Sequence, residues 1–125
     1  MKNLLFIFCF ILSLGLTAQE NEVVLHYGET IVLGDREITF QDVSQDSRCP
    51  TDVNCVWAGE VKLDLIINEG KFATEDKYSF TAGNAIILWS DENESCTLVA
   101  VSPYPKTSAK IPKEAYFLTL QMVSK

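Results

Sequence analysis

Histidine is nearly absent from this chain, which has only His26 among its 125 residues. A nucleophilic triad uses an imidazole as its base, and many metal centres use several imidazoles as ligands. His26 lies between Leu25 and Tyr27 in a strand-like segment, with no serine or cysteine nucleophile motif beside it. The sequence therefore predicts no catalytic residue, although a hydrolase that uses carboxylates alone stays open, because the 17 Asp and Glu residues offer many pairs.

Basic residues are also few, with 10 Lys and Arg against 17 Asp and Glu and a formal net charge of −7. Such a chain is repelled by polyanions, so nucleic acid and anionic membrane surfaces are not expected as partners. The same acidic surplus is common in proteins that simply need to be soluble.

Long apolar runs are missing except near the N-terminus, where Lys2 precedes an apolar run over residues 4–16 that ends in small residues. This run is shorter than the roughly 20 residues that cross a bilayer. The pattern predicts a signal peptide over residues 1–18, cleaved before Gln19, and a single β domain over residues 19–125. The protein is then exported to the periplasm or outside the cell, with no membrane span after cleavage; an uncleaved anchor is the alternative.

Apolar residues in the rest of the chain recur with a period of two, which is typical of half-buried β-strands, and no segment has the 3.6-residue period of a helix. Turn residues (Gly, Asn, Asp, Ser and Pro) separate the apolar segments. The predicted strands cover residues 23–27, 30–33, 37–40, 61–67, 78–81, 85–89, 96–101 and 116–122. The predicted fold is all-β, an antiparallel β-sandwich or small barrel of about seven to eight strands.

Two cysteines, Cys49 and Cys55, flank a polar turn that begins with Pro50. In an exported protein such a pair is expected to form a disulfide, and a compact turn brings the two residues within bridging distance. Chain entropy favours a longer link from either cysteine to Cys96, nearly 4 kcal/mol against about 2.4 for the local bridge. We predict the local bridge, with Cys96 as a buried free thiol in an alternating segment.

Metal and cofactor sites are not predicted. Three cysteines with His26 form a conceivable zinc set, but their spacing lacks the short paired-ligand pattern, and an oxidising compartment disfavours thiolates. Residues 91–94 gather oxygen atoms suitable for calcium, yet they lack the alternating spacing and the glycine of a dedicated calcium loop. A solvated turn is the favoured interpretation of residues 91–94.

The run DSRCPTDVNCVWAGEVKLDL, from Asp46 to Leu65, resembles the signature of a group of small bacterial exported proteins of no known activity. In that group Asp-Ser-Arg-Cys-Pro is followed by a second cysteine and then by Trp-Ala-Gly leading into a strand. The resemblance is looser over residues 98–103 and in the last strand. It implies a compact exported β domain and brings no activity with it. Cys96 lies outside the signature, which fits an unpaired cysteine.

Three residues around the cysteine pair are predicted to hold this loop in place. Asp46 is a short acceptor for turn amides, and Gly59 permits a backbone conformation or a close approach that a side chain blocks. Trp57 is predicted to plug one end of the core, with an exposed recognition anchor as the alternative.

The loop surface centred on Arg48, Asp52 and Val53 is the predicted binding site, with a protein or glycan as the partner. Arg48 is also expected to pair with Asp46 or Asp52. The predicted function is a non-enzymatic binding or interaction module, because rigid loops on β-sandwiches often carry recognition. The alternative is an inhibitor of exported peptidases that presents the braced loop.

The one long irregular stretch, residues 102–113, contains three prolines and three lysines. Lysine and proline commonly protect sheet edges from pairing, so edge protection is the favoured interpretation. A docking loop for an acidic partner is the alternative.

Cleavage before Gln19 has a direct consequence for the mass of the exported protein. Intact-mass measurement of protein purified from the cell envelope or medium should give a chain that starts at Gln19. A chain that still starts at Met1 contradicts both the cleavage and the predicted compartment.

Overall fold

The structure, a computed structural model, describes residues 20–107 and 109–125. The predicted signal peptide, residues 1–18, lies outside the described residues. The strands are β1 (Glu20–His26), β2 (Thr30–Leu33), β3 (Arg36–Asp46), β4 (Val61–Glu69), β5 (Phe72–Phe80), β6 (Ile86–Ser90), β7 (Glu94–Ser102) and β8 (Phe117–Ser124). A 3-10 turn, η1 (Lys113–Ala115), precedes β8. Within the described ranges no helix is long and apolar enough to cross a membrane.

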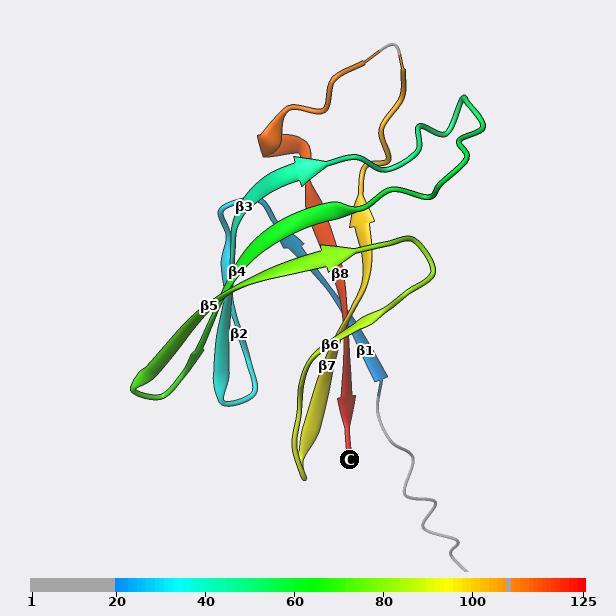
Figure 1. Ribbon diagram of the computed structural model, residues 1–125. Helices are drawn as coiled ribbons and strands as arrows, with labels where there is room; N and C mark the ends of the chain where they lie inside the picture. The colour runs from blue at the N-terminus through cyan, green and yellow to red at the C-terminus, as the bar shows by residue number, and fades with distance from the viewer. Residues whose placement is uncertain (1–19, 108) are drawn as a thin grey trace, which may run out of the picture.

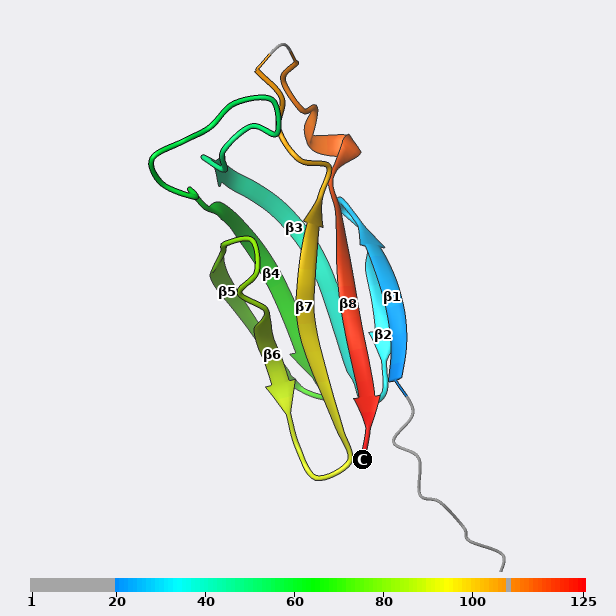
Figure 2. The same cartoon turned by 90° about the vertical axis from the view of Figure 1, so that its right-hand side faces the viewer.

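The strands form two antiparallel four-stranded sheets with the orders β1-β8-β7-β6 and β2-β3-β4-β5. The two sheets face each other across the core, as Figures 1 and 2 show. This arrangement confirms the predicted all-β antiparallel fold and is a sandwich, not a closed barrel.

The core follows from the period-two pattern, because alternate side chains of each strand point between the sheets. Leu63 and Leu65 of β4 and Leu118 and Leu120 of β8 are fully buried. Each such side chain contributes about 1.5–3 kcal/mol when it leaves water. Cys96 of β7 lies in the same core, and burial raises the pKa of its thiol to about 12.

Several strands are longer than the sequence predicts, among them β3, which runs to Asp46 instead of ending at residue 40, and β5. The predicted strand starts near Tyr78, whereas β5 begins at Phe72 and pairs with β4 over its full length. β5 is an edge strand, and its first six residues are exposed on both faces, so they carry no apolar alternation. The tight turn before β5 has Gly70 at φ 59°, a conformation that favours glycine.

Two connections meet at one end of the sandwich and frame the candidate site. One joins β3 to β4 through residues 47–60, and the other joins β7 to β8 through residues 103–116. Figure 1 shows them, green and orange, above the same end of the strands, opposite the C-terminus. A backbone hydrogen bond joins the two connections, from the Thr51 N–H to the Pro105 carbonyl at 3.1 Å.

The cysteine arrangement is testable by labelling. A thiol reagent should leave the native protein unmodified, because Cys96 is buried and the other two described cysteines are bridged. After unfolding without reductant, Cys96 alone should react, and peptide mapping should recover a Cys49–Cys55 linked peptide. A peptide that links Cys96 to Cys55, or rapid labelling of Cys55 in the native state, contradicts this arrangement.

Candidate functional site

The connection over residues 47–60, called the braced loop below, carries the predicted disulfide. Cys49 and Cys55 are bridged, with their Cα atoms 5.8 Å apart, inside the range that disulfides require. The local pairing predicted from the sequence is therefore confirmed, and the zinc alternative is wrong because two of its thiolates are consumed. Cys96 is free and buried, as predicted.

The two legs of the braced loop are paired at their base. Ser47 N–H donates to the Glu60 carbonyl at 2.8 Å, and Cys49 N–H donates to the Ala58 carbonyl at 3.1 Å. Gly59 lies between these contacts with φ 69°, and a Cβ there would overlap the Ser47 carbonyl oxygen. This is the close backbone approach that the sequence predicts for Gly59. The base therefore tolerates no side chain at this position.

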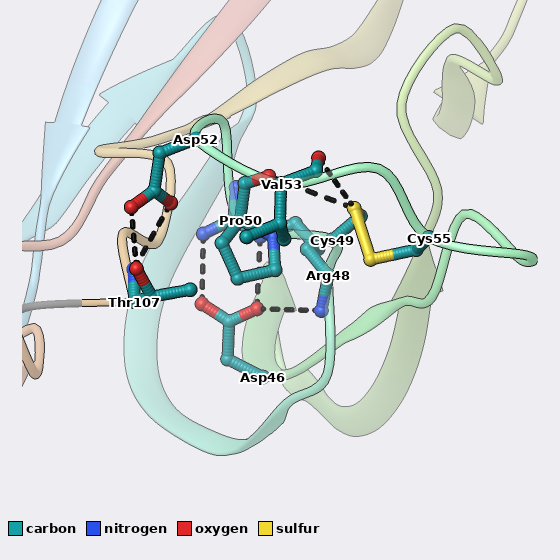
Figure 3. Close-up of a disulfide and its surroundings, with 8 residues drawn as sticks. All are labelled: Asp46, Arg48, Cys49, Pro50, Asp52, Val53, Cys55 and Thr107. Carbon is teal, nitrogen blue, oxygen red and sulfur yellow. Dashed lines mark hydrogen bonds and ion pairs between the residues drawn. A yellow bond between two sulfur atoms is a disulfide. The ribbon is translucent and has the colours of Figure 1, made fainter.

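Arg48 is buried beneath the braced loop, with only 3% of its surface exposed. Its Nε and one terminal nitrogen donate to the two carboxylate oxygens of Asp46 at 2.9 and 2.8 Å, as Figure 3 shows. Its terminal nitrogens also donate to the carbonyls of Val101 at 2.6 Å and Pro103 at 2.8 Å. Tyr116 Oη donates to Asp46 at 2.7 Å, which completes what we call the Arg48 cluster.

The binding role predicted for Arg48 is corrected by this geometry. Its guanidinium points inward from the end of β3 and meets the last carbonyl groups of β7, and the ring of Tyr104 stacks over it at 4.6 Å. A guanidinium with satisfied donors and a covering ring is not available to a partner. Of the two carboxylates considered for it, Asp46 is the partner and Asp52 is not. Arg48 therefore holds the loop, as Asp46 does.

The contacts within the Arg48 cluster change the pKa values of Asp46 and Tyr116. Burial acts to raise the pKa of Asp46, but the hydrogen bonds from Arg48 and Tyr116 outweigh it and hold that pKa below its usual value. Burial and the bond to Asp46 raise the pKa of Tyr116 to about 12. The Asp46 contribution to stability is therefore present above the unfolded-state pKa and is lost as pH falls through the lower folded-state pKa.

Trp57 is not a core plug, because 73% of its surface is exposed. The neighbouring Val56 is 96% exposed, and Val53 is also exposed. The disulfide and the paired legs project the loop away from the sandwich, so the residues after Cys55 face solvent. We call these three side chains the apolar tip. The sequence signal for it is the apolar pair directly after the second cysteine, inside a polar loop.

Asp52 is exposed and bonds to the β7–β8 connection. Its carboxylate accepts from the Thr107 amide at 3.1 Å and from the Thr107 hydroxyl, as Figure 3 shows. These bonds hold the pKa of Asp52 below its usual value. Asp52 thus joins the two connections, and only Val53 of the three predicted binding residues offers an uncommitted exposed side chain.

Edge protection by residues 102–113 is also corrected. β7 and β8, which this stretch connects, are inner strands of their sheet, so the stretch lies at the end of the sandwich and not along a sheet edge. Two of its prolines bond to the braced loop instead, since the Pro103 and Pro105 carbonyls accept from Arg48 and Thr51.

The other candidates from the sequence lie apart from this end or in ordinary surroundings. His26 is exposed at the end of β1, and its amide donates to Glu29. Asp91 accepts from Arg36 at 2.7 Å and from the amides of Asn93 and Glu94, and these bonds lower its pKa to about 2. Among the described residues, no three His, Cys, Asp or Glu side chains lie close enough to hold a metal ion.

Comparison with known proteins gives no relatives: no family model, no curated protein and no solved structure matches this chain.

Arg48 is buried and Trp57 is exposed, the reverse of what the sequence predicts. We therefore expect a large loss of stability when Arg48 is replaced and a small one when Trp57 is replaced. Arg48→Ala should lower the free energy of unfolding by about 3–5 kcal/mol, because it leaves the Asp46 carboxylate buried without its cation. Trp57→Ala should change it by less than about 1 kcal/mol, since an exposed side chain contributes little. Urea unfolding followed by circular dichroism measures both. A strongly destabilised Trp57→Ala or an unaffected Arg48→Ala contradicts the assignment.

Proposed function

We propose that this protein is an exported, non-enzymatic binding module that docks on a protein partner through the apolar tip of the braced loop. The observation that carries the proposal is the exposure of Val56 and Trp57, 96% and 73%, at the end of a loop that the structure holds by a disulfide. Tryptophan is enriched among the residues that dominate binding energy at protein interfaces.

The stiffness of the braced loop favours recognition. A loop that is already ordered loses less conformational entropy on binding than a free one. Here the disulfide, the paired legs and the bonds between Asp52 and Thr107 all restrict it. None of these restraints uses the side chains of the apolar tip, which stay available for a partner.

A protein partner fits the tip better than a glycan. Glycans present many hydroxyl groups and require free polar side chains that can bond to them. The charged side chains closest in sequence are paired, Asp52 with Thr107 and Glu60 with Lys62. Two valines and a tryptophan instead form the kind of apolar centre that a protein interface buries.

A peptidase inhibitor is the second candidate, and the exposed apolar residues at the loop end are the feature that favours it. Such an inhibitor presents an extended segment to the protease cleft. The backbone bends at both Val56 and Trp57, so a surface that docks beside a partner is the better match.

Export is part of this proposal. A disulfide persists in oxidising compartments outside the cytosol, and the signal-peptide pattern of residues 1–18 and the resemblance over residues 46–65 point the same way. We propose the periplasm or the extracellular space as its location.

Quantitative capture from the envelope fraction tests the apolar tip. The exported protein with a C-terminal affinity tag should recover a discrete protein partner, and Trp57→Ala or Val56→Ser should reduce that recovery about tenfold or more, as loss of an interface hot spot does. The matched control is Val32→Ser, the same change at a valine that is 67% exposed on β2, which should leave recovery unchanged.

Equal recovery with Val56→Ser and Val32→Ser contradicts the proposal. The recovered partner could instead be an exported peptidase whose activity falls when the protein is added. That result replaces the proposed binding module with the peptidase inhibitor.

A further inference from the structure

A second surface at the same end of the sandwich is a cleft of about 240 Å³ in the β7–β8 connection. We call it the lysine cleft. It is lined by Pro103, Tyr104, Lys106, Ala109, Lys110, Ile111, Pro112 and Ala115.

The charge of the lysine cleft is opposite to that of the protein. Lys106 and Lys110 are both exposed, and neither forms a salt bridge with a described residue. By contrast, Lys62 and Lys113 pair with Glu60 and Asp42. In a chain where acids outnumber bases 17 to 10, two exposed ammonium groups on one cleft are suited to an anionic ligand. The Asp52 carboxylate is the nearby acid, because Lys106 helps to lower its pKa.

Apart from these two lysines, the walls of the cleft are apolar. The ring of Tyr104 has one face over the Arg48 guanidinium, and this residue remains partly exposed to the cleft. Ile111, with Pro103 and Pro112, completes an apolar surface. Whole small molecules generally occupy pockets of about 300–1,000 Å³. This smaller, open cleft is suited to one apolar side chain of a longer ligand.

The braced loop also holds the first part of the cleft backbone in place. Arg48 donates to the Pro103 carbonyl at 2.8 Å, and Asp52 accepts from Thr107. A backbone bridge between Lys106 and Ala109 closes the turn between the two lysines. A ligand therefore meets an ordered surface and does not have to order it.

We infer that the lysine cleft binds an acidic peptide segment, with one apolar side chain against Tyr104 and Ile111 and a carboxylate at each of Lys106 and Lys110. This inference is independent of the apolar tip, since it rests on different residues and on charge.

The test is a titration of the 15N-labelled exported protein, followed by NMR, with two probes: the capped tripeptide acetyl-Glu-Leu-Glu-amide and its neutral counterpart acetyl-Gln-Leu-Gln-amide. We expect saturable amide shifts at Tyr104, Ile111 and Ala115. The acidic probe should bind about fivefold more tightly than the neutral one, which two exposed ion pairs can supply. This preference should decrease as salt is added, because salt screens exposed charges.

Charge variants separate the cleft from the net charge of the protein. The double variant Lys106→Gln with Lys110→Gln should bind both probes equally. The matched control, Lys71→Gln with Lys77→Gln on the exposed β5 hairpin, changes the net charge by the same amount and should keep the preference.

The inference is overturned by any of three results: no saturable shifts with the acidic probe, equal binding of both probes to the unmodified protein, or equal loss in the two double variants. Shifts centred on Val56 and Trp57 also overturn it, because they assign the peptide to the apolar tip. Capture of the envelope partner is measured separately, so either proposal can fail without the other.

Discussion

The ion pair between Arg48 and Asp46 is the constraint on which this end of the molecule depends. A buried guanidinium is costly unless its donors are satisfied, and here Asp46 supplies a bidentate partner while two carbonyl groups accept two further hydrogen bonds. Asp46 ends β3 in one sheet, and Val101 lies in β7 of the other. The pair therefore fastens the two sheets together at the point where both connections leave them.

The polar and apolar side chains at this end of the sandwich are consequently used differently. Polar groups such as Asp52 and Thr107 bond to each other and hold the connections together. The apolar side chains of Val56 and Trp57 are left facing solvent, which is the reverse of the usual distribution. Their exposure at the end of a held loop is what supports the binding role proposed for them.

The sequence predicts the fold well because period-two alternation reports directly on burial between two sheets, and the local disulfide follows from spacing and turn residues. The first residues of β5 escape prediction because neither face of that edge is covered. The predicted burial of Arg48 and Trp57 is wrong for a different reason. The acceptors that bury Arg48 lie 53 and 55 positions later in the chain, so no local pattern reveals them, whereas average burial tendencies alone place a tryptophan inside and an arginine outside.

The two ends of β3 show how surroundings decide what an arginine does. At its start, Arg36 pairs with Asp91 at 2.7 Å and Glu69 at 3.1 Å, carboxylates that are substantially exposed. Water and salt screen such pairs, so they contribute little to stability. Just past its end, Arg48 has a fully buried side chain, which donates to the backbone carbonyls of Val101 and Pro103 as well as to Asp46. The buried pair lies under the braced loop and links it to the other sheet, and a surface held in this way favours the binding that we propose for the apolar tip and the lysine cleft.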